Sequence, residues 1–375
     1  MDAVKAYAVP IVAPRDLLEE YTKIRKLAVN EILKYVTYSK TGKAHLRFTK
    51  EDRRALRNEL LKGWKFAKHY VDSAIHSAIS IVKGWVTLYN KGKAKSKPVV
   101  TRRAVYVKTT LFSVKDGMLR ITIEPRKRYL EVDLSGFDYL PKDYDTIGGL
   151  ILLEDRLIIT FKKNVDLREP RDFASFDVNL TNITALIGEE IVRFDLRELY
   201  HIHRVCEEKR RRTQKLSKTK PKTAKKLLRK YSRRERNRVC DFIHKLTTAI
   251  ARMLSTRGYG AILEDLKGIK NNLNKGKDLN RKLSKWNART FQFMLEYKLR
   301  WYGLPVIYVN PAHTSTTCPL CAGHMVAYEG RLVKCKKCGL VADRDVVAAI
   351  NLQMWGVRGA PERVRALAEK LLSAG

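Results

Sequence analysis

The chain has 375 residues, and its 76 lysines and arginines outnumber its 39 aspartates and glutamates to give a formal net charge of +37. That length predicts two or three domains, and so large a positive excess favours a polyanionic partner, for which nucleic acid is the best fit. The sequence shows no signal peptide and no apolar run of about 20 residues, so we expect no membrane span.

The first third of the chain predicts one strand followed by helices. Residues 1–13 predict a short strand, and residues 15–37 carry apolar side chains at helical spacing. Thr49 is placed to cap a second helix, with Asp52 near its N-terminal dipole. A third helix is expected over about 64–83.

From Val99 to Phe161 the apolar period switches to two, and Gly and Asp turns separate the segments. This pattern predicts a small antiparallel barrel or sheet. Because the first strand precedes the helices, we expect a helical unit inserted between that strand and the remaining ones.

A second composition shift falls near Pro170. Phe173–Val178 predicts an apolar strand that carries an aspartate, with hairpin partners at 183–186 and 191–196. Between Lys209 and Arg238 roughly half of the residues are basic, and two long helices broken near Pro221 are expected. The alternative is a pair of solvated helix faces, which ordinarily mix both signs of charge. The candidate nucleic-acid contacts here are Arg210, Arg211, Arg212, Lys225, Lys226, Arg229, Arg233 and Arg234.

The last third alternates strands and helices around a polar stretch. The expected elements are a buried strand at 259–263 that ends in Glu264, a polar mobile segment at 271–282, a helix at 286–301, a buried strand at 305–309 and a short helix at 360–375.

Four of the six cysteines form two CxxC pairs with thirteen residues between them: Cys318, Cys321, Cys335 and Cys338. Thiolates at this spacing close a tetrahedron around Zn²⁺, and CxxC pairs favour a metal site over a disulfide framework. Because four thiolates leave no open position, we expect this zinc to be structural.

Three carboxylates have the character of catalytic groups. Asp177 lies inside an apolar strand, Glu264 ends another strand, and Asp345 begins a helix. A buried carboxylate is costly unless it is paired or binds a metal. If the three converge, they can hold two Mg²⁺ ions for phosphodiester hydrolysis. Each also has an alternative reading as a cap or turn residue, and Asp343 is a candidate helix cap.

Three segments resemble the RuvC-type nuclease motifs of the TnpB family, transposon-encoded RNA-guided DNA endonucleases related to the miniature type V CRISPR nucleases. They are Phe176–Asn179, Ile262–Leu266 and Asp343–Asn351. The resemblance is specific over about 171–356 and only architectural over 1–170. Val347 departs from the family, which commonly has Asn there, but no metal ligand is lost.

The resemblance implies an α/β plus β fold, with an RNase H-like (RuvC) nuclease domain into which a four-cysteine zinc module is inserted and a small wedge β-barrel that carries a helical insert. By position these would be a wedge at 1–13 and 94–170, a helical recognition insert at 14–93, a nuclease domain at 171–310 and 343–356, a zinc-binding target-nucleic-acid module at 311–342 and a tail at 357–375.

By the same resemblance, Asp177, Glu264 and Asp345 would be the catalytic acids that hold Mg²⁺, and the four cysteines would hold Zn²⁺. The implied partners are a guide RNA and a double-stranded DNA target beside a short flanking motif. The implied location is the cytoplasm of a prokaryote, at the nucleoid when the protein is bound to DNA. Whether it is a monomer or a dimer stays open.

Two other functions stay open. One is a nuclease-inactive protein that binds DNA under RNA guidance. The other is a transposase, because His201 and His203 match the two-histidine pattern of single-strand transposases and Tyr200 lies beside them.

Overall fold

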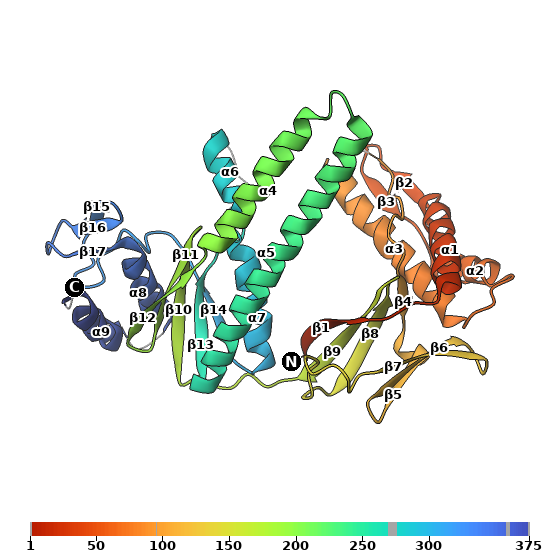
Figure 1. Cartoon of the computed structure of the whole chain (residues 1–375), viewed down its shortest axis with the longest axis horizontal. Helices are drawn as coiled ribbons and strands as arrows, with labels where there is room; N and C mark the ends of the chain where they lie inside the picture. Colours follow the sequence, from red (N-terminus) through yellow and green to blue (C-terminus); the bar gives the residue numbers. More distant parts are fainter. Residues whose placement is uncertain (1, 95, 269–275, 358–360, 374–375) are drawn as a thin grey trace. The chain divides into compact units, whose positions relative to one another are not determined.

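The computed structural model describes residues 2–94, 96–268, 276–357 and 361–373 (Figure 1). Its contacts divide the chain into two compact units, one over Asp2–Asn164 and one from Val165 onward. In the part of the chain that the structure describes, no helix is both long and apolar enough to cross a membrane.

Two antiparallel sheets contain most of the strands of the first unit. The strand pattern predicted for this region is confirmed, and β1 pairs along its whole length with β9, far away in the sequence. The four-stranded sheet has the order β1-β9-β8-β4, and the three-stranded sheet has the order β5-β6-β7. The bounds are β1 (Asp2–Pro10), β4 (Val105–Val107), β5 (Phe112–Lys115), β6 (Met118–Glu124), β7 (Arg128–Asp133), β8 (Thr146–Leu152) and β9 (Arg156–Asn164), with a 3-10 turn at Thr109–Leu111.

The helices of the first unit lie between β1 and β4 in the sequence. They are α1 (Arg15–Leu33), α2 (Lys50–Leu60) and α3 (His69–Asn90), and the short strands β2 (Val36–Tyr38) and β3 (Ala44–Leu46) pair between α1 and α2. The predicted cap is confirmed, because Asp52 N donates to Thr49 Oγ1 (3.2 Å) and Thr49 N donates back to Asp52 Oδ2 (2.8 Å). Helix α3 begins later than the sequence pattern indicated, after a turn in which Trp64 Nε1 donates to Ala67 O (3.2 Å).

A five-stranded mixed sheet forms the centre of the second unit, in the order β12-β11-β10-β13-β14. The first three strands are antiparallel neighbours, whereas β10–β13 and β13–β14 are parallel pairs. The bounds are β10 (Asp172–Val178), β11 (Asn182–Ile187), β12 (Glu190–Asp195), β13 (Tyr259–Glu264) and β14 (Val306–Val309). Strand β13 is buried over most of its length, as expected for a central parallel strand, whereas the edge strand β14 is half-buried rather than buried as predicted.

Helices cover both faces of this sheet (Figure 1). On one face lie α5 (Pro221–Arg257) and α7 (Ala288–Trp301), and α4 (Arg197–Lys215) packs along α5. On the other face α8 (Arg344–Gly356) packs on β10, β11, β13 and β14, and α9 (Pro361–Ser373) packs on α8. Pro221 stands in the first turn of α5, which confirms the predicted break between the two basic helices.

The prediction of a mobile polar segment at 271–282 is partly wrong. Its first residues lie outside the described ones, but Lys277–Lys285 forms helix α6. Tertiary ion pairs hold this helix, because Lys285 pairs with Glu207 of α4 and Arg281 Nε lies 3.3 Å from Glu207 Oε1. Such long-range pairs leave no local sequence signal.

Between β14 and α8 the chain forms a small three-stranded antiparallel sheet. Its strands are β15 (Met325–Ala327), β16 (Leu332–Cys335) and β17 (Val341–Asp343), and β17 leads directly into α8. The four cysteines of the two CxxC pairs lie in and beside this sheet.

The close packing of α8 on the sheet can be tested at Gly356. A Cβ at this position would lie 2.7 Å from Ile262 Cδ1 and 2.8 Å from Ile262 Cγ2. We therefore expect Gly356→Ala to lower the free energy of unfolding by about 1–3 kcal/mol through overpacking, as measured by urea denaturation. Gly84→Ala is the control, because a Cβ there meets nothing within 4 Å, and replacing a helical glycine should stabilise by up to about 1 kcal/mol. Equal stability of the two variants would contradict the packing argument.

Candidate active site and four-cysteine cluster

Asp177 and Glu264 lie side by side at one end of the sheet. Strands β10 and β13 run parallel, and Phe176 is paired with Leu263. Asp177 and Glu264 are the next residues of the two strands, so they lie side by side. Phe176 and Leu263 belong to the core beneath α5 and α7. Because side chains alternate along a strand, Asp177 and Glu264 point to the opposite face, where α8 packs.

The N-terminal turn of α8 brings the third acid to the same place. Ser175, on the same face of β10 as Asp177, donates to Ala349 O of α8 (2.6 Å) and fixes that helix against the strand. Asp345 then lies close enough to Asp177 for its charge to act on that acid, as the charge of Glu264 does. Asp345, Asp177 and Glu264 are only 4%, 8% and 9% exposed. The structure thus brings together the three acids that the sequence singled out.

Burial controls the protonation of two of these acids. It raises the pKa of Asp177 to about 7, and the charges of Glu264 and Asp345 act in the same direction. Asn179 Nδ2 donates to Asp177 Oδ2 (2.6 Å), and this contact and the charge of Arg331 partly lower that pKa. Burial also raises the pKa of Glu264 to about 7. Carboxyls with these pKa values become fully ionised near neutral pH only when a cation compensates their charge.

Asp343 and Asp345 have different surroundings. Asp343 caps α8, because Asp345 N donates to Asp343 Oδ1 (2.8 Å), and Arg193 Nη2 donates to Asp343 Oδ2 (2.8 Å). Asp345 Oδ2 accepts from the Arg331 guanidinium and from Asn182 Nδ2 (3.4 Å). The predicted capping role of Asp343 is confirmed, and Asp345 is the acid that faces the site.

A second group of polar residues supports the acids, and sequence reasoning missed it. Asn351 is 1% exposed, and its Nδ2 donates to Thr314 O (2.7 Å) and to Thr317 O (2.8 Å). Thr314 Oγ1 in turn lies 3.5 Å from Glu264 Oε1, and Gln292 Nε2 donates to Glu264 O (2.8 Å). The sequence contains only a weak indication of these residues. Asn351 is the last residue of the third motif segment, and Thr314 lies in the Thr-Ser segment before the first cysteine.

The four cysteines form a compact cluster. Their Sγ atoms all lie within 4.8 Å of one another, with Cys318–Cys338 at 3.7 Å and Cys321–Cys335 at 3.5 Å. A tetrahedral zinc site with Zn–S bonds of about 2.3 Å has S–S edges of about 3.8 Å, so the donor set fits. Gly323 makes room for it, because a Cβ there would lie 3.0 Å from Cys335 Sγ and 3.2 Å from Cys321 Sγ.

This cluster is separate from the carboxylates. Among the residues that the structure describes, no other group of three or more His, Cys, Asp or Glu side chains has its ligand atoms gathered within that spacing. Val347, where the TnpB family commonly has Asn, is fully buried in the apolar cluster that includes Cys318, Met325 and Val333. The departure at Val347 therefore lies beneath the cysteine module.

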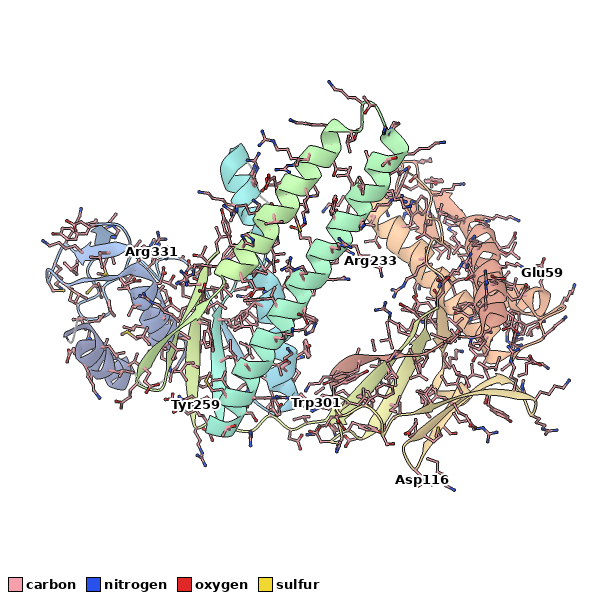
Figure 2. All side chains as sticks on the ribbon, in the orientation of Figure 1. Glu59, Asp116, Arg233, Tyr259, Trp301 and Arg331 are labelled. Carbon is pink, nitrogen blue, oxygen red and sulfur yellow. The ribbon has the colours of Figure 1, made fainter. Side chains whose placement is uncertain are left out.

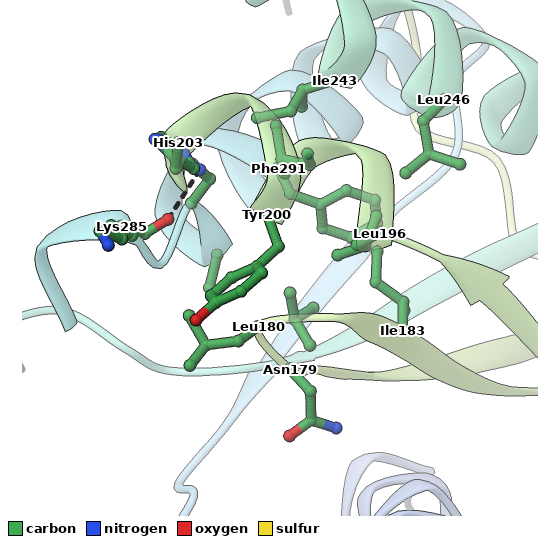
Figure 3. Close-up of a pocket in the computed structure, with 14 residues that line it drawn as sticks. Asn179, Leu180, Ile183, Leu196, Tyr200, His203, Ile243, Leu246, Lys285 and Phe291 are labelled. Carbon is green, nitrogen blue, oxygen red and sulfur yellow. Dashed lines mark hydrogen bonds between the residues drawn. The ribbon is translucent and has the colours of Figure 1, made fainter. Parts of the chain in front are cut away.

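The histidine pair does not form a metal site. His203 is 9% exposed, its Nδ1 is hydrogen-bonded to Glu235 Oε1 (2.8 Å), and its Nε2 accepts from Asn287 Nδ2 (2.7 Å). Both ring nitrogens are thus used in internal contacts. Figure 3 shows His203 and Tyr200 beside a mainly apolar pocket at the base of α4.

Most of the predicted basic contact residues face solvent on α4 and α5. Arg210 is the exception, because it is half-buried and pairs with Glu235. Arg212 is exposed but pairs with Glu208. The other exposed residues are Arg211, Lys225, Lys226, Arg229, Arg233 and Arg234, of which Arg233 is labelled in Figure 2.

Three family models match consecutive parts of the chain. Residues 17–122 match the uncharacterized protein MJ0013 family, residues 159–287 match a family described as a probable transposase, and residues 289–352 match the Cas12f1-like TNB domain. The last two matches contain the three acids and the four cysteines.

Curated proteins and solved structures also resemble the chain. The TnpB-like protein MJ1635 of Methanocaldococcus jannaschii is 34% identical over 346 residues, which cover 91% of this chain and 81% of that protein. A putative RNA-guided DNA endonuclease of Streptomyces pristinaespiralis is 36% identical over 125 residues, which cover 32% of this chain and 29% of that protein. The structure of a Cas12f1–sgRNA–target DNA complex matches with a TM-score of 0.58 and 14% identity, over 90% of this chain and 81% of that one, which shows a shared fold. Because the alignment with MJ1635 spans nearly the whole sequence, the chain belongs to the TnpB-like family.

Proposed function

We propose that this chain is an RNA-guided DNA endonuclease of a transposon, which cleaves DNA beside a short flanking motif at Asp177, Glu264 and Asp345. The observation that carries the proposal is the burial of these three acids at one end of the sheet, where two of them have pKa values of about 7. Membership of the TnpB-like family and the name of the Streptomyces relative support the same reaction.

The acids fit a site for Mg²⁺, because hard oxygen donors that repel one another in a buried position are stabilised by a divalent cation. When bound, two magnesium ions supply Lewis-acid stabilisation of the phosphate and a more acidic attacking water. The chain itself orients the acids. Asn179 holds Asp177, Thr314 lies against Glu264, and the first turn of α8 fixes Asp345.

The four cysteines would hold a structural Zn²⁺ that keeps the sheet β15–β17 folded. Their side chains take up all four positions of a tetrahedron, so the cluster has no place for a substrate. Strand β17 ends at Asp343, the cap of α8. The folded module therefore also fixes the helix turn that carries Asp345.

The exposed basic residues of α4 and α5 would contact the phosphates of guide RNA and DNA. A protein of this kind recognises the shape of a guide–target duplex and leaves the reading of sequence to base pairing. We assign residues 14–93, inserted between the strands of a wedge at 1–13 and 94–170, to guide and flanking-motif recognition. We assign 171–310 and 343–356 to the nuclease domain, 311–342 to the target-nucleic-acid module and 357–375 to a tail.

Cleavage is tested with protein that carries its copurifying RNA, whose sequence defines a matched DNA duplex. In the presence of Mg²⁺ we expect Asp177→Asn to lower the cleavage rate on the order of 10³-fold or more, with guided DNA binding retained in a gel-shift assay. Asp241→Asn is the control, because it makes the same change at an acid of α5 that pairs with Lys245 at the surface.

Wild-type cleavage by Asp177→Asn would refute the catalytic assignment. Guided binding by the wild-type protein without any cleavage would instead support the nuclease-inactive alternative.

The buried acids also predict a pH-dependent stability without divalent cations. Because folding raises the pKa of Asp177 from 3.8 to about 7, the folded state binds an extra proton between these values, and stability falls as pH rises through this window. At pH 8 without Mg²⁺, Asp177→Asn should be more stable than wild type by on the order of 1–3 kcal/mol, and at pH 4 the difference should nearly vanish. Urea denaturation at both pH values measures it, and identical pH dependence of the two proteins would contradict the buried-charge argument.

Zinc content tests the cysteine cluster. Purified wild-type protein should contain about one zinc per chain by mass spectrometry of the metal, because four thiolates surround one position. Cys321→Ser should lose the metal and lower the melting temperature. Cys240→Ser, at a cysteine outside the cluster, should keep both. Retention of zinc by Cys321→Ser would rule out this ligand set.

A further inference from the structure

Arg331 joins the cysteine module to the carboxylate site. It lies between β15 and β16, and Arg344 N, at the start of α8, donates to Arg331 O (3.0 Å). Its guanidinium donates to Asp345 Oδ2, a carboxylate whose side chain is only 5% exposed, whereas the Arg331 side chain is 57% exposed. The backbone of Arg331 is thus fixed, and its side chain reaches from solvent into the site.

The same guanidinium acts on more than one acid. Its charge interacts with Asp177 and Asp343 as well as with Asp345. One monovalent cation of this chain therefore contacts one of the three acids proposed to hold a divalent cation, and its charge also acts on a second, Asp177. The carboxylate oxygens, in the described part of the chain, are not gathered as closely as the four cysteine sulfurs.

We propose that Arg331 competes with the divalent cation for Asp345 in the nucleic-acid-free protein, so that the cysteine module regulates the metal affinity of the active site. This proposal rests on the proposed function of the three acids. A metal ion on Asp345 would compete with the guanidinium for the charge of the same carboxylate, because Arg331 already donates to Asp345 Oδ2. Arg331 can leave without unfolding the module, because it is held by its backbone and its side chain is largely exposed.

A supporting role for Arg331 makes the opposite prediction. If the guanidinium orients Asp345 for the metal, its removal weakens metal binding. If it competes, its removal strengthens metal binding. The sign of the change in affinity therefore separates the two roles.

The experiment is a titration of zinc-loaded protein with Mn²⁺, followed by the electron paramagnetic resonance signal of free Mn²⁺. The active site is identified as the binding that Asp177→Asn removes. We expect Arg331→Gln to bind Mn²⁺ about two- to fivefold more tightly than wild type, the range expected for loss of a partly exposed ion pair. Arg331→Lys, which keeps a positive charge on a long side chain, should stay closer to wild type than Arg331→Gln.

Arg193→Gln is the matched control. Arg193 is 52% exposed and pairs with Asp343, so its loss removes the same charge close by without freeing Asp345. Zinc content and melting temperature are measured for every variant, so that a change in the fold is detected separately.

Unchanged or weaker Mn²⁺ binding by Arg331→Gln would overturn the proposal, as would an equal gain in Arg193→Gln. If the wild-type protein has no Mn²⁺ site that depends on Asp177, the metal centre of the proposed function is itself wrong. The two failures are therefore distinguishable.

Discussion

The second unit depends on one electrostatic constraint, the burial of three carboxylates beside one another at the end of a sheet. Asp177, Glu264 and Asp345 are each less than a tenth exposed, and burial holds two of them near a pKa of about 7. Buried like charges are unfavourable unless hydrogen bonds and cations compensate them. The surrounding structure supplies the hydrogen bonds through Asn179, Asn182 and Arg331, and the proposed metal would compensate the remaining charge.

The cysteine cluster and the carboxylates are neighbours in the sequence but separate centres in space. The cysteines close around a position of their own, and Val347 completes the apolar packing beneath them. The two centres still communicate through three contacts. Strand β17 leads into the cap of α8, Asn351 anchors the loop that begins the module, and Arg331 reaches from its hairpin to Asp345. The cysteine module and the site are therefore joined by direct contacts.

The charged residues of the two basic helices α4 and α5 differ in their surroundings, because some form internal ion pairs and others are exposed to solvent. Glu235, the single acid between Lys209 and Arg238, lies within α5 and pairs with two residues of α4, Arg210 and the buried His203. Arg210 and His203 thus contribute to the packing of the helical hairpin. Other basic residues of the two helices, such as Lys225, Lys226 and Arg229, are exposed to solvent, and these are the residues proposed to contact a polyanion.

The sequence by itself determined the features that depend on local pattern and ligand chemistry. Two CxxC pairs define a tetrahedral thiolate set, acids inside apolar strands must be compensated, and Pro221 must interrupt a helix that would otherwise run through it. Only the tertiary structure decided which strands are neighbours. It therefore also decided that Asp177 and Glu264 lie at the same end of the sheet, although a pair of long helices separates them in the chain. It also decided the roles of Arg331, Asn351 and Thr314 and the existence of α6, because these depend on contacts between residues that are distant in the sequence. Periodicity reports which face of an element is buried, but not which distant side chain will lie against it.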